Sequence, residues 1–228
     1  MTQEDNMQIA PLMKIISHDL RGPIGNLKSV MTLFRSGELE MEQAKMFMGQ
    51  IEVGVDKSLN MLDNLIEWSQ ATTFPPKDTI ELGDIIQTAY DLVLEDYEKK
   101  NIRFEIDLGG VSEVVWNKIA MRFIMRNLIS NALKFTAENG LVSVSVARSE
   151  DKILISTIDE GIGIPEAMRS GIFAMSKDNR RIGTSGEKGT GIGLFLSKDL
   201  ARRNNGKMWL EVNPSREGVI FHLEMDQK

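Results

Sequence analysis

Residues 186–194 read Gly-Glu-Lys-Gly-Thr-Gly-Ile-Gly-Leu and stand directly before a helical pattern. A companion stretch at 159–165, Asp-Glu-Gly-Ile-Gly-Ile-Pro, follows a strand-like pattern. Eight of the 19 glycines lie between Gly161 and Gly193. Glycine lets backbone N–H groups approach a phosphate, and the N-terminus of the following helix adds a positive end. The two stretches therefore favour an anion site, although glycines that only form turns are an equally good interpretation of either stretch alone.

The glycine pattern differs from the most familiar nucleotide motifs. It is neither Gly-x-Gly-x-x-Gly nor a loop ending in Gly-Lys-Ser/Thr, and the His-Arg-Asp and Asp-Phe-Gly signatures of protein kinases are missing. A dinucleotide-binding domain, a P-loop and a protein-kinase fold are thus disfavoured.

A third signal lies in the helical pattern at 126–136. Asn127 and Asn131 are four residues apart on one helix face, with Lys134 and Phe135 one turn further on. Amide oxygens are good ligands for Mg²⁺, which usually keeps several waters and shares substrate phosphates. Two inert asparagines on a helix surface are the alternative interpretation.

Composition narrows the function further. The chain has 228 residues, 42% of them hydrophobic, and a formal charge of −6, which suits one or two globular domains and disfavours nucleic-acid binding. No cysteine is present, so thiol chemistry is excluded, and the presence of only two histidines disfavours a multi-histidine metal site. No apolar run is long enough to span a membrane, and the N-terminus does not resemble a signal peptide. We expect a cytoplasmic chain without direct membrane contact.

The chain divides at Thr72-Thr73-Phe74-Pro75-Pro76, because tandem prolines end a helix and hold the chain extended. Residues 1–73 are predicted to form a helical hairpin that breaks at Ser36-Gly37-Glu38. Its two apolar stripes recur in heptads. The first consists of Met13, Ile16, Leu20, Pro23, Leu27, Val30 and Phe34, and the second of Met41, Ala44, Met48, Ile51, Val55, Leu62 and Leu65. One hairpin cannot bury both stripes, so we expect a dimeric four-helix bundle; a monomeric hairpin packed on the second part is the alternative.

Residues 74–228 are predicted to be an α+β domain with an antiparallel sheet covered by helices. Helical patterns cover Glu81–Lys99 and Lys118–Phe135, and strand patterns cover Ile102–Leu108, Leu141–Ala147, Ile153–Ile158, Met208–Val212 and Val219–Met225. His222 alternates with inward-facing Phe221 and Leu223, so we interpret it as an outward structural residue. The tryptophans and methionines are interpreted as packing residues.

His18 falls at the heptad position farthest from the apolar seam, so the pattern places it in solvent. Asp19 follows directly and could accept an imidazole proton, which leaves the other ring nitrogen as a nucleophile. Pro23 interrupts the helix five residues later at a cost of about 3 kcal/mol. A kink beside an exposed histidine indicates a site, with an inert surface histidine as the alternative.

These signals occur in the order and spacing of the sensor histidine kinases of two-component systems, and the chain resembles that family along nearly its whole length. Residues 17–23 resemble the phosphoacceptor box, 126–136 the asparagine box, 159–165 the first glycine box and 189–193 the second. Gly171-Ile172-Phe173 resembles the phenylalanine box. The resemblance implies a dimerisation hairpin at 1–73 and a Bergerat-type ATP-binding sandwich at 74–228.

The resemblance also implies a role for each matched residue. His18 would be the phosphoacceptor and Asp19 its base, while Asn131, assisted by Asn127, would hold Mg²⁺. Asp159 would accept a hydrogen bond from the adenine amino group. The rest of the nucleotide pocket would be formed by Lys134, Phe135, Gly161, Gly163, Ile164, Lys188, Gly189, Thr190, Gly191, Gly193 and Leu194. Residues 174–188 would be a mobile lid whose charge, from Lys177, Arg180, Arg181 and Lys188, suits a triphosphate.

Three positions depart from the family pattern. Glu160 stands where the family usually has asparagine, which puts Mg·ATP affinity in doubt. Phe173 is followed by Ala174-Met175-Ser176, without the usual second aromatic residue. Gly22 stands where family members that dephosphorylate their partner carry threonine or asparagine, which puts phosphatase activity in doubt.

The function implied is ATP-dependent phosphorylation of His18 and transfer to an aspartate of a response regulator. A non-kinase ATPase with the same pocket and a catalytically silent dimeric scaffold are the alternatives. We expect a homodimer that also binds a response regulator receiver domain and uses ATP and Mg²⁺. The chain is expected to be either a soluble kinase or the cytoplasmic part of a larger membrane-tethered sensor.

Overall fold

The computed structural model describes residues 17, 21–22, 24–37, 41–73, 77–176, 181–187, 189–213 and 217–227. The chain forms two compact units, Met1–Leu65 and Ile66–Lys228, and the division falls inside helix α2 (Met41–Thr73). Within the described part of the chain, no helix has the length and apolar character needed to cross a membrane. The domain boundary at residues 73 and 74 stays a prediction.

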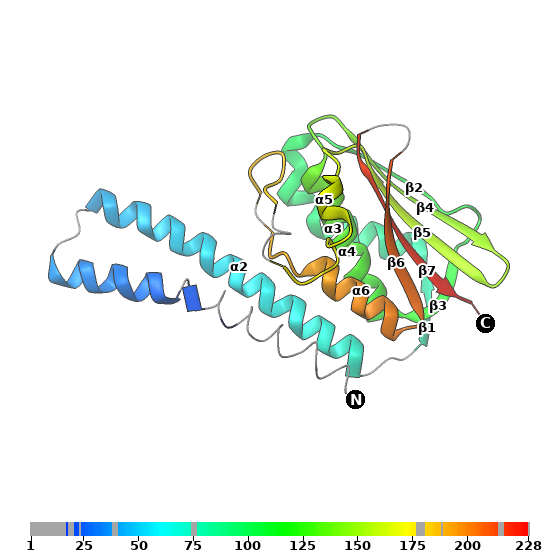
Figure 1. The fold of residues 1–228 in the computed structure, drawn as a ribbon, viewed down its shortest axis with the longest axis horizontal. Helices are drawn as coiled ribbons and strands as arrows, with labels where there is room; N and C mark the ends of the chain where they lie inside the picture. Colours follow the sequence, from blue (N-terminus) through cyan, green and yellow to red (C-terminus); the bar gives the residue numbers. More distant parts are fainter. Residues whose placement is uncertain are drawn as a thin grey trace. The chain divides into compact units, whose positions relative to one another are not determined.

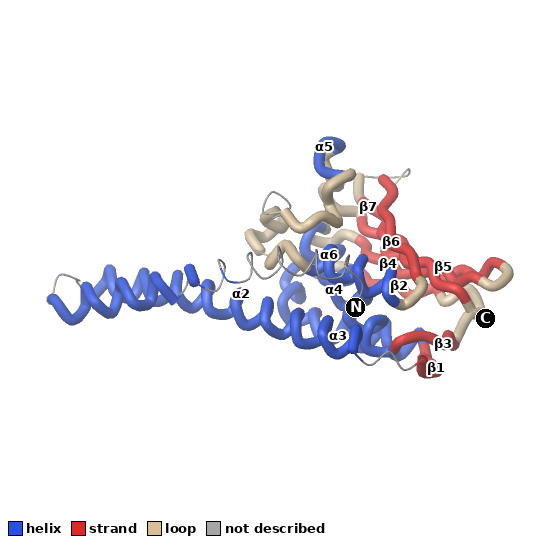
Figure 2. The backbone as a smooth tube through the Cα atoms, turned by 60° about the horizontal axis from the view of Figure 1, so that its bottom comes forward, coloured by secondary structure: helices blue, strands red, loops and turns tan. Residues whose placement is uncertain are grey.

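The second unit is built on a five-stranded sheet with helices on one face (Figures 1 and 2). In spatial order the strands are β2 (Arg103–Asp107), β4 (Leu141–Ser149), β5 (Lys152–Asp159), β7 (Val219–Asp226) and β6 (Gly206–Val212). The helices are α3 (Leu82–Tyr97), α4 (Lys118–Phe135) and α6 (Gly193–Arg203), and the short α5 (Glu166–Arg169) precedes the lid. This arrangement confirms the predicted sandwich of a sheet covered by helices.

Alternation along the strands explains why this sheet buries one face. In β4, Val142, Val144 and Val146 are buried, whereas Ser143 and Ser145 on the opposite face are half-buried. Each buried aliphatic side chain contributes on the order of 1.5–3 kcal/mol relative to exposure. The apolar row of α4 covers the sheet, so the polar residues of this helix are confined to its borders.

Two parts of the topology differ from the prediction. Strands β1 (Lys77–Glu81) and β3 (Glu113–Asn117) form a separate antiparallel pair that the sequence patterns missed. Strand β2 pairs with β4 in parallel, so the expectation of a wholly antiparallel sheet was wrong at this edge. The reason is the long connection between these strands, which contains β3 and α4. This crossover brings the chain back to the starting end of β2, so that β4 runs in the same direction as β2.

His222 takes the structural role that was predicted but is not solvent-facing. The residue is only 8% exposed, because the ring of Trp209 on β6 stacks on it at 4.9 Å between ring centres. The hydroxyl of Ser156 lies 2.8 Å from Nδ1. Burial lowers the pKa of His222, and the nearby Glu211 carboxylate only partly opposes that shift. The expected outward position is therefore covered by an aromatic neighbour.

The first unit contains two helical segments, residues 24–36 and the part of α2 up to Leu65. Gly37 lies in the left-handed region, with φ of +73°, and its N–H donates to the Phe34 carbonyl at 3.3 Å. This geometry favours glycine and ends the first segment. The predicted hairpin is therefore shown in part, because Pro23 and residues 38–40 lie outside the described residues.

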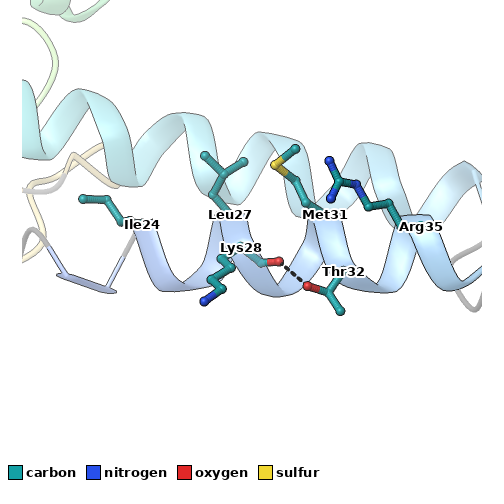
Figure 3. Close-up of a pocket in the computed structure, with 6 residues that line it drawn as sticks. All are labelled: Ile24, Leu27, Lys28, Met31, Thr32 and Arg35. Carbon is teal, nitrogen blue, oxygen red and sulfur yellow. Dashed lines mark hydrogen bonds between the residues drawn. The ribbon is translucent and has the colours of Figure 1, made fainter.

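The apolar stripes of the first unit are only partly buried. Val30, Ala44 and Ile51 are buried, at 9%, 2% and 9% exposure. Between 38% and 66% of the residue surface is exposed at Leu27, Phe34, Met41, Met48, Val55 and Leu62. Figure 3 shows one apolar groove on the first segment, lined by Ile24, Leu27 and Met31 with Lys28 and Arg35 at its borders. One hairpin thus leaves much of its predicted seam in solvent.

Candidate nucleotide-binding site

The C-terminal end of α4 organises the candidate site. The last carbonyls of a helix lack partners within the helix and need them from elsewhere. Here the Phe135 carbonyl accepts from the Ile162 N–H at 3.1 Å, and the Lys134 carbonyl accepts from the Thr184 N–H at 3.1 Å. One helix end therefore meets both the first glycine box and the lid segment.

The first glycine box passes against this helix end without room for side chains. A Cβ at Gly161 would lie 2.8 Å from the carbonyl carbon of Phe135, closer than real Cβ contacts. Gly163 has φ of +63°, a conformation that favours glycine. Ile164 is half-buried, and its carbonyl accepts from Nε of Arg169 at 2.8 Å. The glycines are thus required by the close backbone approach.

Asp159 at the end of β5 is the buried carboxylate of the site. It is 4% exposed, and its Oδ1 accepts from the N–H groups of Gly161 at 2.9 Å and Val219 at 3.2 Å. Burial raises the pKa of Asp159 to about 6, although these two N–H groups and the Arg181 charge pull it down. Among the described residues no hydrogen bond is made by Oδ2. This oxygen fits the acceptor that the sequence predicted for an adenine amino group.

The second glycine box lies against the polar side chains of α4. A Cβ at Gly193, where α6 begins, would collide with Oδ1 of Asn127, and one at Gly189 would lie 2.9 Å from Nζ of Lys134. Gly191 has φ of +78°. Thr190 and Leu194 are half-buried neighbours in the same segment. Substitution of these glycines would displace the side chains predicted to contact metal and phosphate.

The asparagine pair on α4 is suited to one Mg²⁺ ion shared with phosphate. Asn131 is half-buried, and its amide makes no hydrogen bond within the described ranges. Asn127 uses Nδ2 to donate to the Phe123 carbonyl at 3.1 Å, so its Oδ1 remains the oxygen next to Gly193. The described residues contain no group of three His, Cys, Asp or Glu side chains that could hold a metal. The chemistry therefore fits an ion that takes its other ligands from phosphate and water.

The described part of the lid is more firmly anchored than the sequence led us to expect. Arg181 donates from Nη1 to the Gly163 carbonyl at 2.6 Å, and its guanidinium lies 5.0 Å from the centre of the Phe135 ring. Thr184 donates from its hydroxyl to the Thr136 carbonyl at 2.8 Å. Residues 181–187 are therefore held against the end of α4 and the first glycine box.

The phenylalanine box contributes packing rather than a visible site contact. Phe173 lies edge-on to Phe221 of β7, with ring centres 6.1 Å apart, and Nζ of Lys198 lies 4.6 Å from the centre of its ring. These contacts connect the segment after α5 to the sheet and to α6.

Three of the predicted site residues, His18, Asp19 and Lys188, lie outside the described residues, as do Lys177 and Arg180. Of the others, the structure brings Asn127, Lys134 and Phe135 of α4 against the two glycine boxes, and Asp159 accepts from the Gly161 N–H. The individual roles of all the predicted site residues stay predictions. The sequence interpretation missed Lys100, a buried amine beside the end of α4. Its position in the charged run 98–100, Glu-Lys-Lys, resembles an ordinary solvated surface, and no local signal distinguishes it from Lys99.

Comparison with known proteins finds an ATPase family that matches the second half of the chain. Residues 117–228 match the family described as histidine kinase-, DNA gyrase B- and HSP90-like ATPases. Phytochrome-like protein Cph1 of Synechocystis sp. is 27% identical over 228 residues, covering 98% of this chain and 30% of Cph1. The catalytic domain of histidine kinase ThkA has a TM-score of 0.57 at 25% identity, over 66% of this chain and 95% of that one. Histidine kinase ThkA in complex with response regulator protein TrrA has a TM-score of 0.74 over 99% of this chain and 64% of that one; at 20% identity, this likeness concerns the fold alone.

The sheet, the asparagine-bearing helix and the two glycine boxes define an ATPase domain of the histidine kinase, gyrase B and HSP90 type. The relatives that match beyond this domain include sensor histidine kinases, so the chain is similar to that family along most of its length. The chain spans less than a third of the length of Cph1.

Proposed function

We propose that the chain is an ATP-dependent histidine kinase that phosphorylates His18 and passes the phosphoryl group to an aspartate of a response regulator. The observation that carries the proposal is the convergence at the end of α4. There, Asn127 and Lys134 lie against the second glycine box, and Phe135 lies against the first. A gyrase-like or chaperone-like ATPase would use the same pocket. Such an ATPase needs no phosphoacceptor, so it would not explain the exposed histidine predicted on the hairpin.

Each residue of the pocket supplies a separate element of phosphoryl transfer. Oδ2 of Asp159 accepts from the adenine amino group, which favours adenine over guanine. Asn131 and Asn127 would hold Mg²⁺ through their amide oxygens, and this ion would screen phosphate charge. Lys134 places its ammonium beside the Gly189 backbone, where it neutralises charge that develops on the phosphates.

On the hairpin, the neutral imidazole of His18 attacks the γ-phosphorus in line with the bridging oxygen that leaves with ADP. Asp19 holds the proton on the other ring nitrogen and then stabilises the charge that develops on the ring. The phosphohistidine is a reactive donor, which suits transfer to a carboxylate. Histidine kinase ThkA, which shares this fold, was solved in complex with response regulator protein TrrA, so the fold is compatible with such a partner.

The exposed seam of the hairpin supports a homodimer. Aliphatic and methionine side chains that a single hairpin leaves in solvent would be buried between two hairpins. The proposed assembly is a four-helix bundle in which residues 1–73 are the dimerisation and phosphotransfer part and 74–228 the catalytic part. We propose a cytoplasmic location for this catalytic chain. The chain would be either a soluble kinase or the cytoplasmic part of a longer protein that is tethered to a membrane.

Incubation with ATP labelled at the γ-phosphate tests the proposal. A histidine kinase gives a labelled chain that loses its label in acid and keeps it in base, and the chain then labels a receiver domain. Free labelled phosphate without labelled protein would instead favour the non-kinase ATPase. Absence of both label and ATP binding would favour the silent scaffold.

A further inference from the structure

Lys100 is the last residue of the short 3₁₀ helix η1 (Glu98–Lys100) and is only 3% exposed. Its Nζ lies 3.0 Å from the Leu133 carbonyl and 2.9 Å from the Lys134 carbonyl, so it binds the end of α4. The same ammonium donates to Oγ1 of Thr184 at 2.7 Å and pairs with Oε1 of Glu187 at 2.6 Å. One buried cation therefore touches both the asparagine-bearing helix and the lid segment.

The contacts of Lys100 explain how a charged amine remains buried. Carbonyls at a helix C-terminus carry partial negative charge and attract a cation. Glu187 supplies the full countercharge, without which a buried ammonium costs several kcal/mol. Burial alone would raise the pKa of Glu187, but the hydrogen bond from Lys100 and N–H groups that include that of Ser185 lower it on balance. Glu187 therefore remains ionised at neutral pH beside the Lys100 amine.

The lid turn at 183–187 is shaped to rest on Lys134. A Cβ at Gly183 would lie 2.6 Å from Cγ of Lys134, so only glycine fits there. The turn is closed by the Gly183 N–H, which donates to the Glu187 carbonyl at 2.9 Å, and by the Ser185 N–H, which donates to Oε2 at 2.8 Å. Gly186 has φ of +88°. The Glu187 side chain thus both closes the turn and reaches Lys100.

We propose that Lys100 is a positioning residue for ATP, fixing the lid turn 183–187 onto the end of α4 so that the second glycine box closes over Lys134. This inference rests on the proposed function, because it assigns Lys100 to the phosphate half of the same pocket. In the described part of the chain, the contacts of Lys100 are with other protein groups. Lys100 would therefore affect ATP binding indirectly, through the residues that it positions.

We call the contacts of Lys100 with the end of α4 and with Thr184 and Glu187 the clamp. The proposal follows from the short distance along the chain between this clamp and the predicted phosphate site. Glu187 is two residues before Gly189, whose backbone lies beside Nζ of Lys134. Fixing Glu187 therefore fixes the start of the glycine box relative to the amine predicted to bind phosphate. The adenine end of the pocket depends on β5 and Asp159, which Lys100 does not touch. Loss of the clamp should consequently weaken binding of the phosphates and spare that of the nucleoside.

A purely structural role predicts a different pattern. If Lys100 only caps α4, loss of its lid partner should leave nucleotide binding unchanged. Glu187→Gln keeps the side-chain shape and removes the charge, and Thr184→Val removes the hydroxyl contact, while both keep Lys100 on the helix carbonyls. Lys100→Met removes both halves of the clamp. Lys99→Met is the matched control, because Lys99 is the exposed neighbour in the same short helix.

The experiment measures Mg·ATP and adenosine affinities of the full chain by competition with a fluorescent nucleotide, together with hydrogen exchange of the Gly183 and Thr184 amides. We expect Glu187→Gln to weaken Mg·ATP about tenfold, near 1.4 kcal/mol, and to change adenosine affinity less than twofold. Thr184→Val should act in the same direction with a smaller effect, and both amides should exchange faster. Lys99→Met should match the parent chain.

Unchanged Mg·ATP affinity in Glu187→Gln and Thr184→Val would overturn the proposal, as would equal losses for ATP and adenosine. Lys100→Met is interpreted only alongside these variants, because removal of a buried cation can unfold the unit. If the parent chain binds nucleotide without phosphorylating His18, the proposed kinase function fails while the clamp test stands. If amide exchange is unaffected by Glu187→Gln, the clamp itself is refuted.

Discussion

The two compact units bury their apolar residues to very different extents. In the ATPase unit, Ile124 and Leu128 of α4 and Val144 of β4 are fully buried by their own chain. In the hairpin, Met48 and Phe34 are 60% and 55% exposed although they occupy predicted core positions. The ATPase unit is therefore complete as a single copy, whereas the hairpin sequence is suited to a partner that supplies the missing half of its core.

The largest expected effect comes from charging that seam. Replacing Met48 and Leu62 with glutamate should convert a dimer to monomers, because each dimer would have to bury four unpaired carboxylates at several kcal/mol each. Light scattering on the eluting protein measures the mass. Glutamate at Gln50 and Asn60, two exposed polar positions of α2, adds the same charge and should keep the dimer. An unchanged mass in the first variant would remove the basis for the four-helix bundle.

The second prediction concerns the complete unit. Asn131→Ala should weaken Mg·ATP binding on the order of 100-fold, because loss of an oxygen ligand removes several kcal/mol of charge stabilisation. The dimer should persist, since Asn131 belongs to the other unit. Calorimetry with and without Mg²⁺ is the measurement, and Arg122→Ala, an exposed position on the same helix, is the control. Equal affinity with and without Mg²⁺ in the parent chain would contradict the metal assignment.

Asp159 makes the adenine end of the pocket sensitive to pH. Its pKa is raised to about 6, mainly by burial, so the carboxylate takes up a proton as pH falls through that value. A protonated Oδ2 cannot accept from the amino group, and adenosine affinity should fall by up to about tenfold per pH unit below pH 6. Above pH 7 the affinity should be level. Adenosine is the right probe because phosphate titrates near the same pH.

Asp159→Asn serves as the reference for this pH effect. The side chain keeps its size but presents an amide in place of the carboxylate, so affinity should be low and independent of pH. A parent chain whose adenosine affinity is also flat between pH 5 and 7 would show that Asp159 is not the acceptor.

The smallest expected effect is phosphatase activity. Gly22 offers no hydroxyl or amide to orient a water near His18. The parent chain should therefore speed the dephosphorylation of the regulator less than tenfold, which corresponds to lowering the activation barrier by less than about 1.4 kcal/mol. Nothing lies within 4 Å of a Cβ built at this exposed helical position, so threonine fits there. Gly22→Thr should raise the rate of phosphate loss from a purified phosphorylated regulator. If the parent chain accelerates dephosphorylation more than tenfold, a residue other than the one at position 22 orients the attacking water, and the inference from Gly22 is wrong.

Sequence patterns predicted the long elements well and the connections poorly. The bounds of α4 were predicted as found, because Asn117 caps the helix by accepting from the Ala120 N–H at 3.0 Å and the apolar row is continuous. Strand β1 contains one hydrophobic residue, Ile80, and β3 has three in a row, so neither shows the alternation that predicted β2, a strand of the same length. The parallel pairing of β2 with β4 depends on where the crossover returns, and local alternation carries no information on this point.

The candidate site shows the same division. Glycine and asparagine patterns located both boxes, because close backbone approach and helix-face spacing are encoded locally. The contact of Lys100 with Glu187 joins residues far apart in sequence, and each stands in a run that resembles solvated surface. The stacking of Trp209 on His222 was also missed, because it depends on the pairing of two strands and not on the pattern within one strand.

The most direct test of the account is to locate the phosphoryl group after the 228-residue chain reacts with Mg·ATP. Mass spectrometry under neutral to basic conditions, which preserve phosphohistidine, should find a single phosphoryl group on His18. His18→Gln should carry none while binding Mg·ATP with the affinity of the parent chain, because nucleophile and nucleotide belong to different units. A phosphoryl group on another residue, or one retained in His18→Gln, would contradict the account.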